Sequence, residues 1–337
     1  MKCRRLWFWL GMAVLPLAIA ASLTIGRYPL SFAEIADFVL AWAGFHHLPE
    51  ARFDMLYNII VDIRLPRILA AVLIGAALSV SGASFQAVFR NPLVSPGLLG
   101  VLGGASFGAA LGMLLSANWF IVQLMSFSMG LLAVGVGVGI AGLFGNRGIV
   151  MLVLGGVISS GLFGALLSIV KYLADPSDDL PAIVYWLMGS LAQVNLNQIG
   201  WLALPMMFGI VLLSLMGRAL DALSMGDDEA RSLGVPVTAI RYGVIVIATL
   251  VSALTVSMAG MIGWVGLIIP HIARFLIGPG NHRLLPLSAC LGALFLLACD
   301  ALARTAITTE IPIGTLTELV GIPIFLLVLH RVRKGWT

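Results

Sequence analysis

Long apolar runs with few charges constrain the fold of this chain more than any other feature. A helix of about 20 apolar residues crosses a bilayer core of about 30 Å, whereas the strands of a membrane barrel would alternate apolar and polar residues. Since 60% of the 337 residues are hydrophobic and 10% are charged, we expect one all-α polytopic membrane domain over residues 1–337, with about ten transmembrane helices. The continuous runs cover residues 6–26, 60–82, 94–115, 119–142, 149–172, 197–217, 239–258, 262–277, 285–303 and 312–330.

The distribution of cationic residues predicts the orientation of these spans. An even number of spans leaves both chain ends on one side, and Arg90, Arg218, Arg274 and Arg283 fall on that side. Cytoplasmic loops are enriched in Lys and Arg. We therefore expect cytoplasmic N- and C-termini and external loops at residues 27–58 and 173–196.

The sequence favours a transporter over an enzyme. It contains neither the G-x-x-x-x-G-K-[ST] phosphate loop nor the H-E-x-x-H zinc motif, so any ATP must be hydrolysed by another chain. The histidines lack a second ligand cluster at metal spacing, and no basic cluster with interleaved aromatic residues is present. We therefore expect no catalytic residue, no metal site and no nucleic-acid partner.

Few ionisable residues interrupt the apolar runs, and this argues against an ion-coupled carrier, which needs such groups at mid-membrane. The clearest exception is Asp300, placed four residues before Arg304, where the two side chains can pair on one helix face. A secondary carrier and a membrane-embedded binding or signalling module remain the alternatives from other classes.

Three arginines mark the external end of the spans. Arg64, Arg67 and Arg304 form a potential carboxylate-binding set. They can equally reach lipid headgroups, or pair with Asp62 and Asp300.

Two internal loops are more informative than the spans. The loop of about residues 219–238 predicts a short helix, because Asp227, Asp228 and Glu229 suit a helix start while Gly234 and Pro236 suit its end. It is either a coupling element or a solvated connector. The loop 90–97 has two prolines and predicts a stiff turn, which either gates a pore or only joins two helices. Glycines repeat every four residues in two runs, which predicts close helix packing: Gly104, Gly108, Gly112, Gly135 and Gly139.

Several motifs in order resemble the FecCD permease family of importers for iron-siderophores, haem, cobalamin and related metal compounds. They cover nearly the whole chain after the first span: residues 64–82 with Gln86, Asn91–Gly100, Tyr185–Ser190, Ala230–Gly234, Gly266–Arg274 and Glu310–Gly314. The resemblance implies ten spans and a homodimer with its pathway at the two-fold axis. It also implies two cytoplasmic ATPases, which would bind ATP and Mg²⁺, a periplasmic binding protein, and a bacterial inner membrane.

The resemblance also assigns roles to residues. Arg64, Arg67 and Arg304 would dock the binding protein. Asp228, Glu229, Ala230, Leu233 and Gly234 would form the coupling helix that seats in the ATPase. Asn91, Leu93, Ile149 and Val150 would lie near the cytoplasmic constriction. Apart from the resemblance, Ser159, Ser160 and Ser168 of the fifth span either line the pathway or pack helices. No cofactor is implied for this chain, and the cargo, whether siderophore, haem, cobalamin or molybdate, stays open.

Overall fold

The computed structural model describes residues 2–116, 118–143 and 149–334, and every regular element within them is helical. The elements in chain order are α1 (Lys2–Thr24), α2 (Phe32–Trp42), α3 (Glu50–Tyr57), the π-helix η1 (Asn58–Arg64), α4 (Leu65–Phe89), the 3₁₀ helix η2 (Pro96–Leu99), α5 (Val101–Leu115), α6 (Trp119–Leu143), α7 (Ile149–Leu173), α8 (Asp179–Leu187), α9 (Leu196–Leu215), α10 (Gly217–Met225), α11 (Asp227–Ser232), α12 (Val237–Ala259), α13 (Val265–Ile277), α14 (Asn281–Thr305) and α15 (Ile313–Lys334).

The prediction of an all-helical membrane fold is confirmed. Each apolar run except 94–115 lies largely within one continuous helical segment. Six helical segments are long and apolar enough to cross a bilayer: Glu50–Phe89, Trp119–Leu143, Ile149–Leu173, Leu196–Leu215, Val237–Ala259 and Asn281–Thr305. Four further apolar helices are shorter: Phe8–Thr24, Val101–Leu115, Val265–Ile277 and Ile313–Val328. The number of ten spans therefore stays a prediction.

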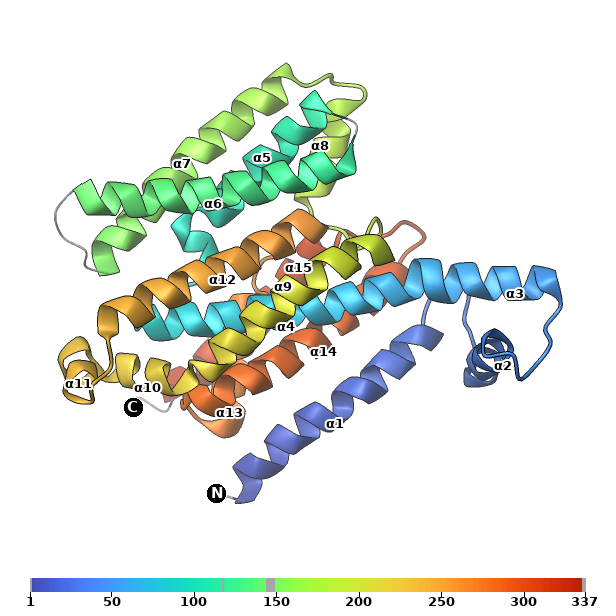
Figure 1. Ribbon diagram of the computed structural model, residues 1–337, viewed down its shortest axis with the longest axis horizontal. Helices are drawn as coiled ribbons and strands as arrows, with labels where there is room; N and C mark the ends of the chain where they lie inside the picture. Colours follow the sequence, from blue (N-terminus) through green and yellow to red (C-terminus); the bar gives the residue numbers. More distant parts are fainter. Residues whose placement is uncertain (1, 117, 144–148, 335–337) are drawn as a thin grey trace.

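Helix α4 lies at the centre of the larger helix group and contacts α9, α12, α13 and α14 (Figure 1). Glycines allow this close packing. A Cβ at Gly75 would collide with the carbonyl oxygen of Gly292 in α14, and a Cβ at Gly82 would collide with that of Gly266 in α13. Small residues let helix backbones approach in a membrane, so α4 is clamped on two sides by backbone contact.

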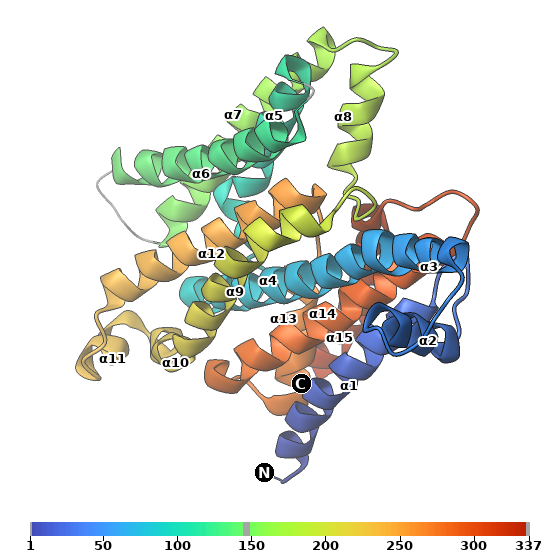
Figure 2. The same cartoon turned by 45° about the vertical axis from the view of Figure 1, so that its right-hand side comes forward.

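Helices α5, α6, α7 and α8 form a second group, which stands apart from the α4 group (Figure 1) and contacts it mainly through α12. Figure 2 shows α8 turning from the end of α7 back toward α9. The packing predicted for the third run is confirmed, since a Cβ at Gly104 or Gly108 would strike the backbone of α6. The same prediction is wrong within this chain for Gly135 and Gly139, which face open space.

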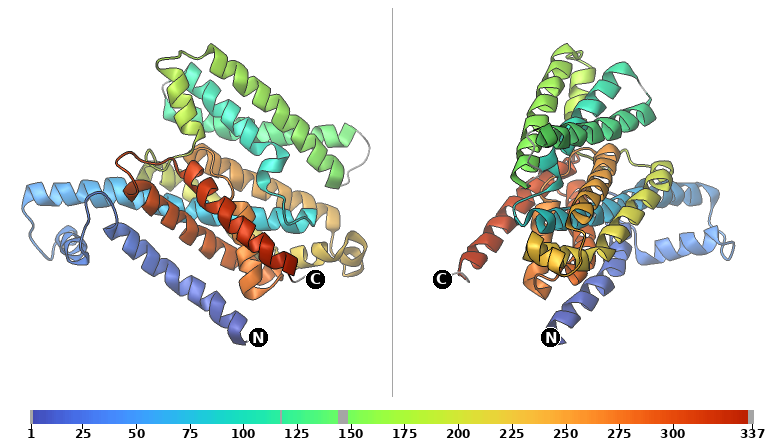
Figure 3. Two further views of the ribbon diagram at one scale, coloured as in Figure 1. Left: turned by 180° about the vertical axis from the view of Figure 1, so that it is seen from behind. Right: turned by 60° about the vertical axis from the view of Figure 1, so that its left-hand side comes forward.

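The two ends of the molecule carry different short helices. Helices α2 and α3 lie at one end and α10 and α11 at the other, and the start of α1 and the end of α15 lie toward the α11 end (Figures 1 and 3). The segments 27–58 and 173–196 are not plain loops, because they contain α2, α3 and α8. The run 94–115 is broken at Gly100, whose φ of +92° suits glycine.

Candidate functional site

The arginine cluster, consisting of Arg64, Arg67 and Arg304, joins the start of α4 to the end of α14. Arg67 donates to Asp300 Oδ1 from Nη2 at 2.8 Å and to Glu310 Oε2 from Nη1 at 3.0 Å. Arg304 Nε lies 2.9 Å from Asp300 Oδ2, one helical turn away. The predicted pairing of Arg304 with Asp300 is therefore confirmed.

The same cluster holds the end of α1. Arg64 donates to the carbonyl oxygens of Leu23 and Tyr28, and Arg304 Nη1 donates to that of Ile25 at 2.9 Å. Arginines at a helix C-terminus satisfy its last carbonyls in this way. The three residues are only 3%, 5% and 7% exposed, in sequence order, so they offer little free surface to a docking partner in this conformation.

We expect Asp300→Asn to destabilise the protein strongly. Asp300 is fully buried between two guanidinium groups, and removing one partner of a buried ion pair costs about 3–5 kcal/mol. Thermal unfolding of the detergent-solubilised protein measures the loss. Asp62→Asn is the matched control, because Asp62 is exposed and forms no ion pair with the described residues. Equal midpoints for the two variants would contradict a structural role for Asp300.

The coupling loop 219–238 folds as two short helices, α10 and α11, where the sequence predicted one. Asp227 begins α11 and Gly234, at φ +77°, follows its end, as predicted. The side chain of Asp228 is 92% exposed and Leu233 is 63% exposed, and Glu229 and Gly234 are exposed too. Ala230 departs from the predicted contact set: it is fully buried, because it packs the helix onto the chain itself.

An ion-pair network ties α11 to the loop 90–97. Asp227 accepts two hydrogen bonds from Arg241 Nη2 at the start of α12, at 2.7 and 2.8 Å, and lies 3.5 Å from Arg90 Nη2. The hydrogen bond from Arg241, aided by the charges of Arg241 and Arg90, lowers the pKa of Asp227 below its ordinary value against partial desolvation. The sequence analysis did not identify this network.

The loop 90–97 turns sharply at Arg90, whose φ is +51°, and Asn91 Oδ1 accepts from the Leu93 amide at 2.9 Å. The predicted turn is therefore confirmed, and its stiffness stays a prediction. Asn91 and Leu93 line a cavity of about 500 Å³ together with Arg90 and Arg274.

The other predicted pathway residues lie on α7. Ile149 is half-buried and Val150 is 68% exposed, and neither lines that cavity. Ser159 Oγ is buried and donates to the Ala133 carbonyl at 2.6 Å, so this side chain packs α7 on α6. Its assignment to the pathway lining stays a prediction. Ser160 is half-buried on the same helix.

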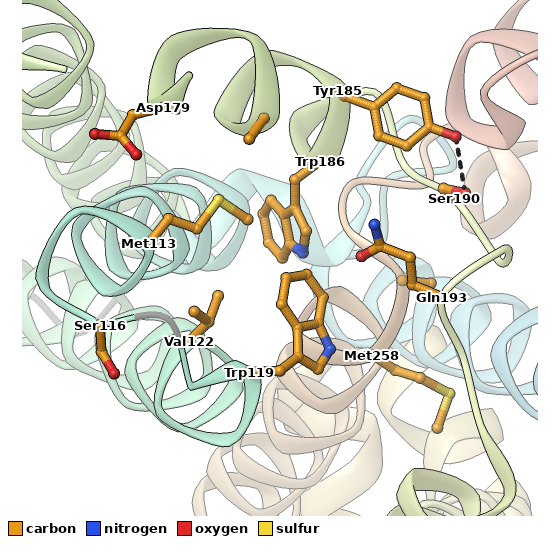
Figure 4. Close-up of a pocket in the computed structure, with 12 residues that line it drawn as sticks. Met113, Ser116, Trp119, Val122, Asp179, Tyr185, Trp186, Ser190, Gln193 and Met258 are labelled. Carbon is orange, nitrogen blue, oxygen red and sulfur yellow. Dashed lines mark hydrogen bonds between the residues drawn. The ribbon is translucent and has the colours of Figure 1, made fainter. Parts of the chain in front are cut away.

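A cavity of about 260 Å³ lies between α5, α6, α8 and the end of α12 (Figure 4). Trp119 and Trp186 face each other across it, while Tyr185 Oη and Ser190 Oγ approach to 3.5 Å at its edge. Its walls are mostly aromatic and apolar. It offers no nucleophile beside a general base.

One serine lies in a sequence motif of hydrolases but not in the structure that this motif forms in them. Ser106 is the centre of a G-x-S-x-G sequence, Gly104–Gly108, which in hydrolases forms a strand-to-helix turn. Here it lies inside α5 and is only 1% exposed. It is therefore a packing residue.

The fold and these sites define a multi-pass membrane protein without catalytic machinery among its described residues. The sequence profile of the FecCD transport family matches residues 14–331. The chain therefore belongs to the FecCD transport family.

Relatives agree with this assignment. The chain is 38% identical over 325 residues to the molybdate import system permease protein MolB of Haemophilus influenzae, covering 96% of this chain and 94% of that protein. It is 35% identical over 327 residues to a probable iron chelatin transport system permease protein of Helicobacter pylori strain 26695, covering 97% and 98%. A metal-chelate type ABC transporter solved in an inward-facing conformation matches with a TM-score of 0.85 and 34% identity, covering 96% of this chain and 98% of that one. The family is one of permease subunits of ABC importers, and such a subunit is not itself an enzyme.

Proposed function

We propose that this chain is the permease of an ATP-driven importer that carries a metal-chelate-type nutrient from the periplasm to the cytoplasm across a bacterial inner membrane. Two copies would form the pathway at their two-fold axis and would bind two ATPase subunits on the cytoplasmic side. The observation that carries the proposal is the exposed tip of α11, with Asp228 and Leu233 outermost and Asp227 tied to the loop 90–97. The exposed surface proposed to contact the ATPase is thereby linked through Asp227 to the loop 90–97, the candidate gate.

The proposed mechanism follows from this connection. Closure of the ATPases on ATP would displace α11, and the Asp227 carboxylate would transmit the displacement to Arg90 and Arg241. Arg90 ends α4 and begins the loop 90–97, so this loop would move together with α4 and α12. The chain supplies alternating access, and no bond in the cargo needs to change.

Docking of a periplasmic binding protein is proposed at the end that carries the arginine cluster. The cluster holds three arginines against Asp300 and Glu310, so it keeps one excess positive charge. The side chain of Glu310 is 25% exposed, whereas that of Asp300 is 1% exposed. A glutamate of the binding protein would therefore reach Arg67 by exchanging with Glu310, without breaking the buried pair.

Native mass spectrometry of the tagged chain, extracted gently from its own membrane, tests the proposed assembly. Two copies of this chain with two copies of an ATPase are expected. Uptake into sealed vesicles made with that assembly is expected only when ATP is present on the ATPase side.

A known importer extracted in parallel provides the control. A lone monomer or dimer, found while the control keeps its ATPase, would contradict the importer. Uptake that proceeds without ATP would favour an ion-coupled carrier instead.

A further inference from the structure

One acidic residue lies within the apolar helix α15 and has no role in the sites described above. Glu318 is exposed, and it makes no hydrogen bond or ion pair with any residue in the described ranges. It belongs to a stripe of α15 that the rest of the chain leaves uncovered: Thr315, Glu318, Leu319, Ile322 and Leu326. The stripe is otherwise mostly apolar.

Glu318 also borders an open cavity of about 320 Å³. The walls come from α4, from η2 and the start of α5, from α12, and from residues 262–264 with the start of α13. Polar groups on the wall include Ser95 and Ser252, and Glu318 is the only charged residue among the residues that line it. The cavity thus meets η2, which directly continues the candidate gate loop 90–97.

The local backbone places the carboxylate at this cavity. Trp264 has φ +67°, a left-handed conformation that is costly for a residue other than glycine. Its ring packs edge-on against Phe325 of α15, at a centroid distance of 6.0 Å. The carboxylate lies beside residues 262–264, since a Cβ added at Gly263 would be 3.5 Å from Glu318 Oε1, in ordinary van der Waals contact.

The ionised side chain of Glu318 needs water or a charge partner in the assembled protein. An ionised side chain against lipid is strongly disfavoured, and ionisable groups in spans almost always face a water-filled cavity or a charge partner. Among the described residues no charge partner is present. A cavity that holds water beside Glu318 satisfies both observations.

We propose that Glu318 lines the transport pathway and gives it a negative potential that disfavours anionic cargo. The proposal rests on the proposed import function and narrows its substrate class to neutral or cationic metal chelates, as opposed to free oxyanions. One unit charge about 4 Å away changes the local concentration of a univalent ion about fivefold in water, and more strongly in a less polar cavity.

Thiol reagents of opposite charge test the proposal without knowledge of the cargo. The chain carries Gly263→Cys as reporter in a background with Cys3→Ser, Cys290→Ser and Cys299→Ala, and is assembled with its ATPase in proteoliposomes. The rates of modification by a cationic and an anionic methanethiosulfonate are compared, with and without ATP and vanadate. The cationic-to-anionic rate ratio is expected to fall at least about fivefold when Glu318→Gln is added.

Controls separate the local charge from general effects. Asp37→Asn removes an exposed charge on α2 and is expected to leave the ratio unchanged, and Ser95→Cys provides a second reporter on the same cavity. The proposal would be overturned if neither reagent modified the reporter cysteines, with or without ATP and vanadate. It would also be overturned if Glu318→Gln left the cationic-to-anionic rate ratio unchanged at both reporters. ATP-driven uptake of free molybdate that is unchanged by Glu318→Gln would overturn the substrate class. A failure of all ATP-driven uptake would instead contradict the import function. The rates of thiol modification would still show whether Glu318 lies beside a water-accessible cavity.

Discussion

Replacing Gly82 by valine is expected to prevent the protein from folding into a stable helix bundle. Gly82 meets the backbone carbonyl of Gly266, so the added Cβ has no flexible side chain to displace, and α4 and α13 must separate. Overpacking of a core typically lowers the free energy of unfolding by about 1–3 kcal/mol. Because the backbone carbonyl of Gly266 cannot move aside like a side chain, we expect Gly82→Val to cost at least the upper value of this range. The monodisperse peak in size-exclusion chromatography of the solubilised protein is expected to be largely lost.

Gly135→Val is the matched control for this prediction. Gly135 lies in α6, also in a membrane helix, but no atom lies within 4 Å of its added Cβ. Its peak and its thermal midpoint are expected to stay close to those of the unchanged chain. A normal peak for Gly82→Val would show that α4 and α13 are not held by backbone contact.

Hydropathy predicted the long apolar helices, but it did not predict the break at Gly100 or the short helices α2, α3 and α8. Continuous apolar runs locate the spans because a bilayer demands long stretches of apolar residues. The break at Gly100 falls inside a run defined by hydropathy, because Leu98, Leu99 and Val101 are as apolar as the residues of a helix. Pro96 and Gly97 just before it are residues that interrupt helices, and they are the local signal of the break. Hydropathy does not distinguish the short helices α2, α3 and α8 from loops, because they lie outside the long apolar runs. A local signal for α2 is present in the capping box of Ser31 and Glu34.

The same limit explains which parts of the candidate sites were predicted. The Asp300 and Arg304 pair lies within one helical turn and can be read from spacing. The contacts of Arg67 with Glu310, 243 residues away, and of Arg241 with Asp227 depend on how distant helices meet, which spacing does not encode. Glu318 was passed over because one carboxylate hardly changes the average hydropathy of its run, although its charge was visible in the sequence.

Asp227→Asn is expected to uncouple ATP hydrolysis from transport if the proposed mechanism holds. The amide keeps the size of the side chain but removes the charge that holds Arg241 and Arg90. Hydrogen bonds to charged groups contribute about 1.5–3 kcal/mol, which corresponds to a loss of about one to two orders of magnitude in the population of the joined state. We expect the ATPase to remain bound and to hydrolyse ATP, while ATP-driven uptake falls about tenfold or more.

Asp54→Asn, an exposed change of the same chemistry on α3 at the opposite end of the molecule, is the control for this prediction.

The pH dependence supplies a second readout. Because the pKa of Asp227 is lowered in the folded protein, the network contributes stability at any pH above the ordinary carboxyl value and loses it as the pH falls through the lowered value. Coupling in the unchanged chain is thus expected to be insensitive to pH near neutrality, so the uncoupling caused by Asp227→Asn should not be reproduced by mild acid. Uptake that survives Asp227→Asn at full rate would show that α11 moves the gate through its packing alone, by way of Ala230, and not through the charges of Asp227 and its arginines.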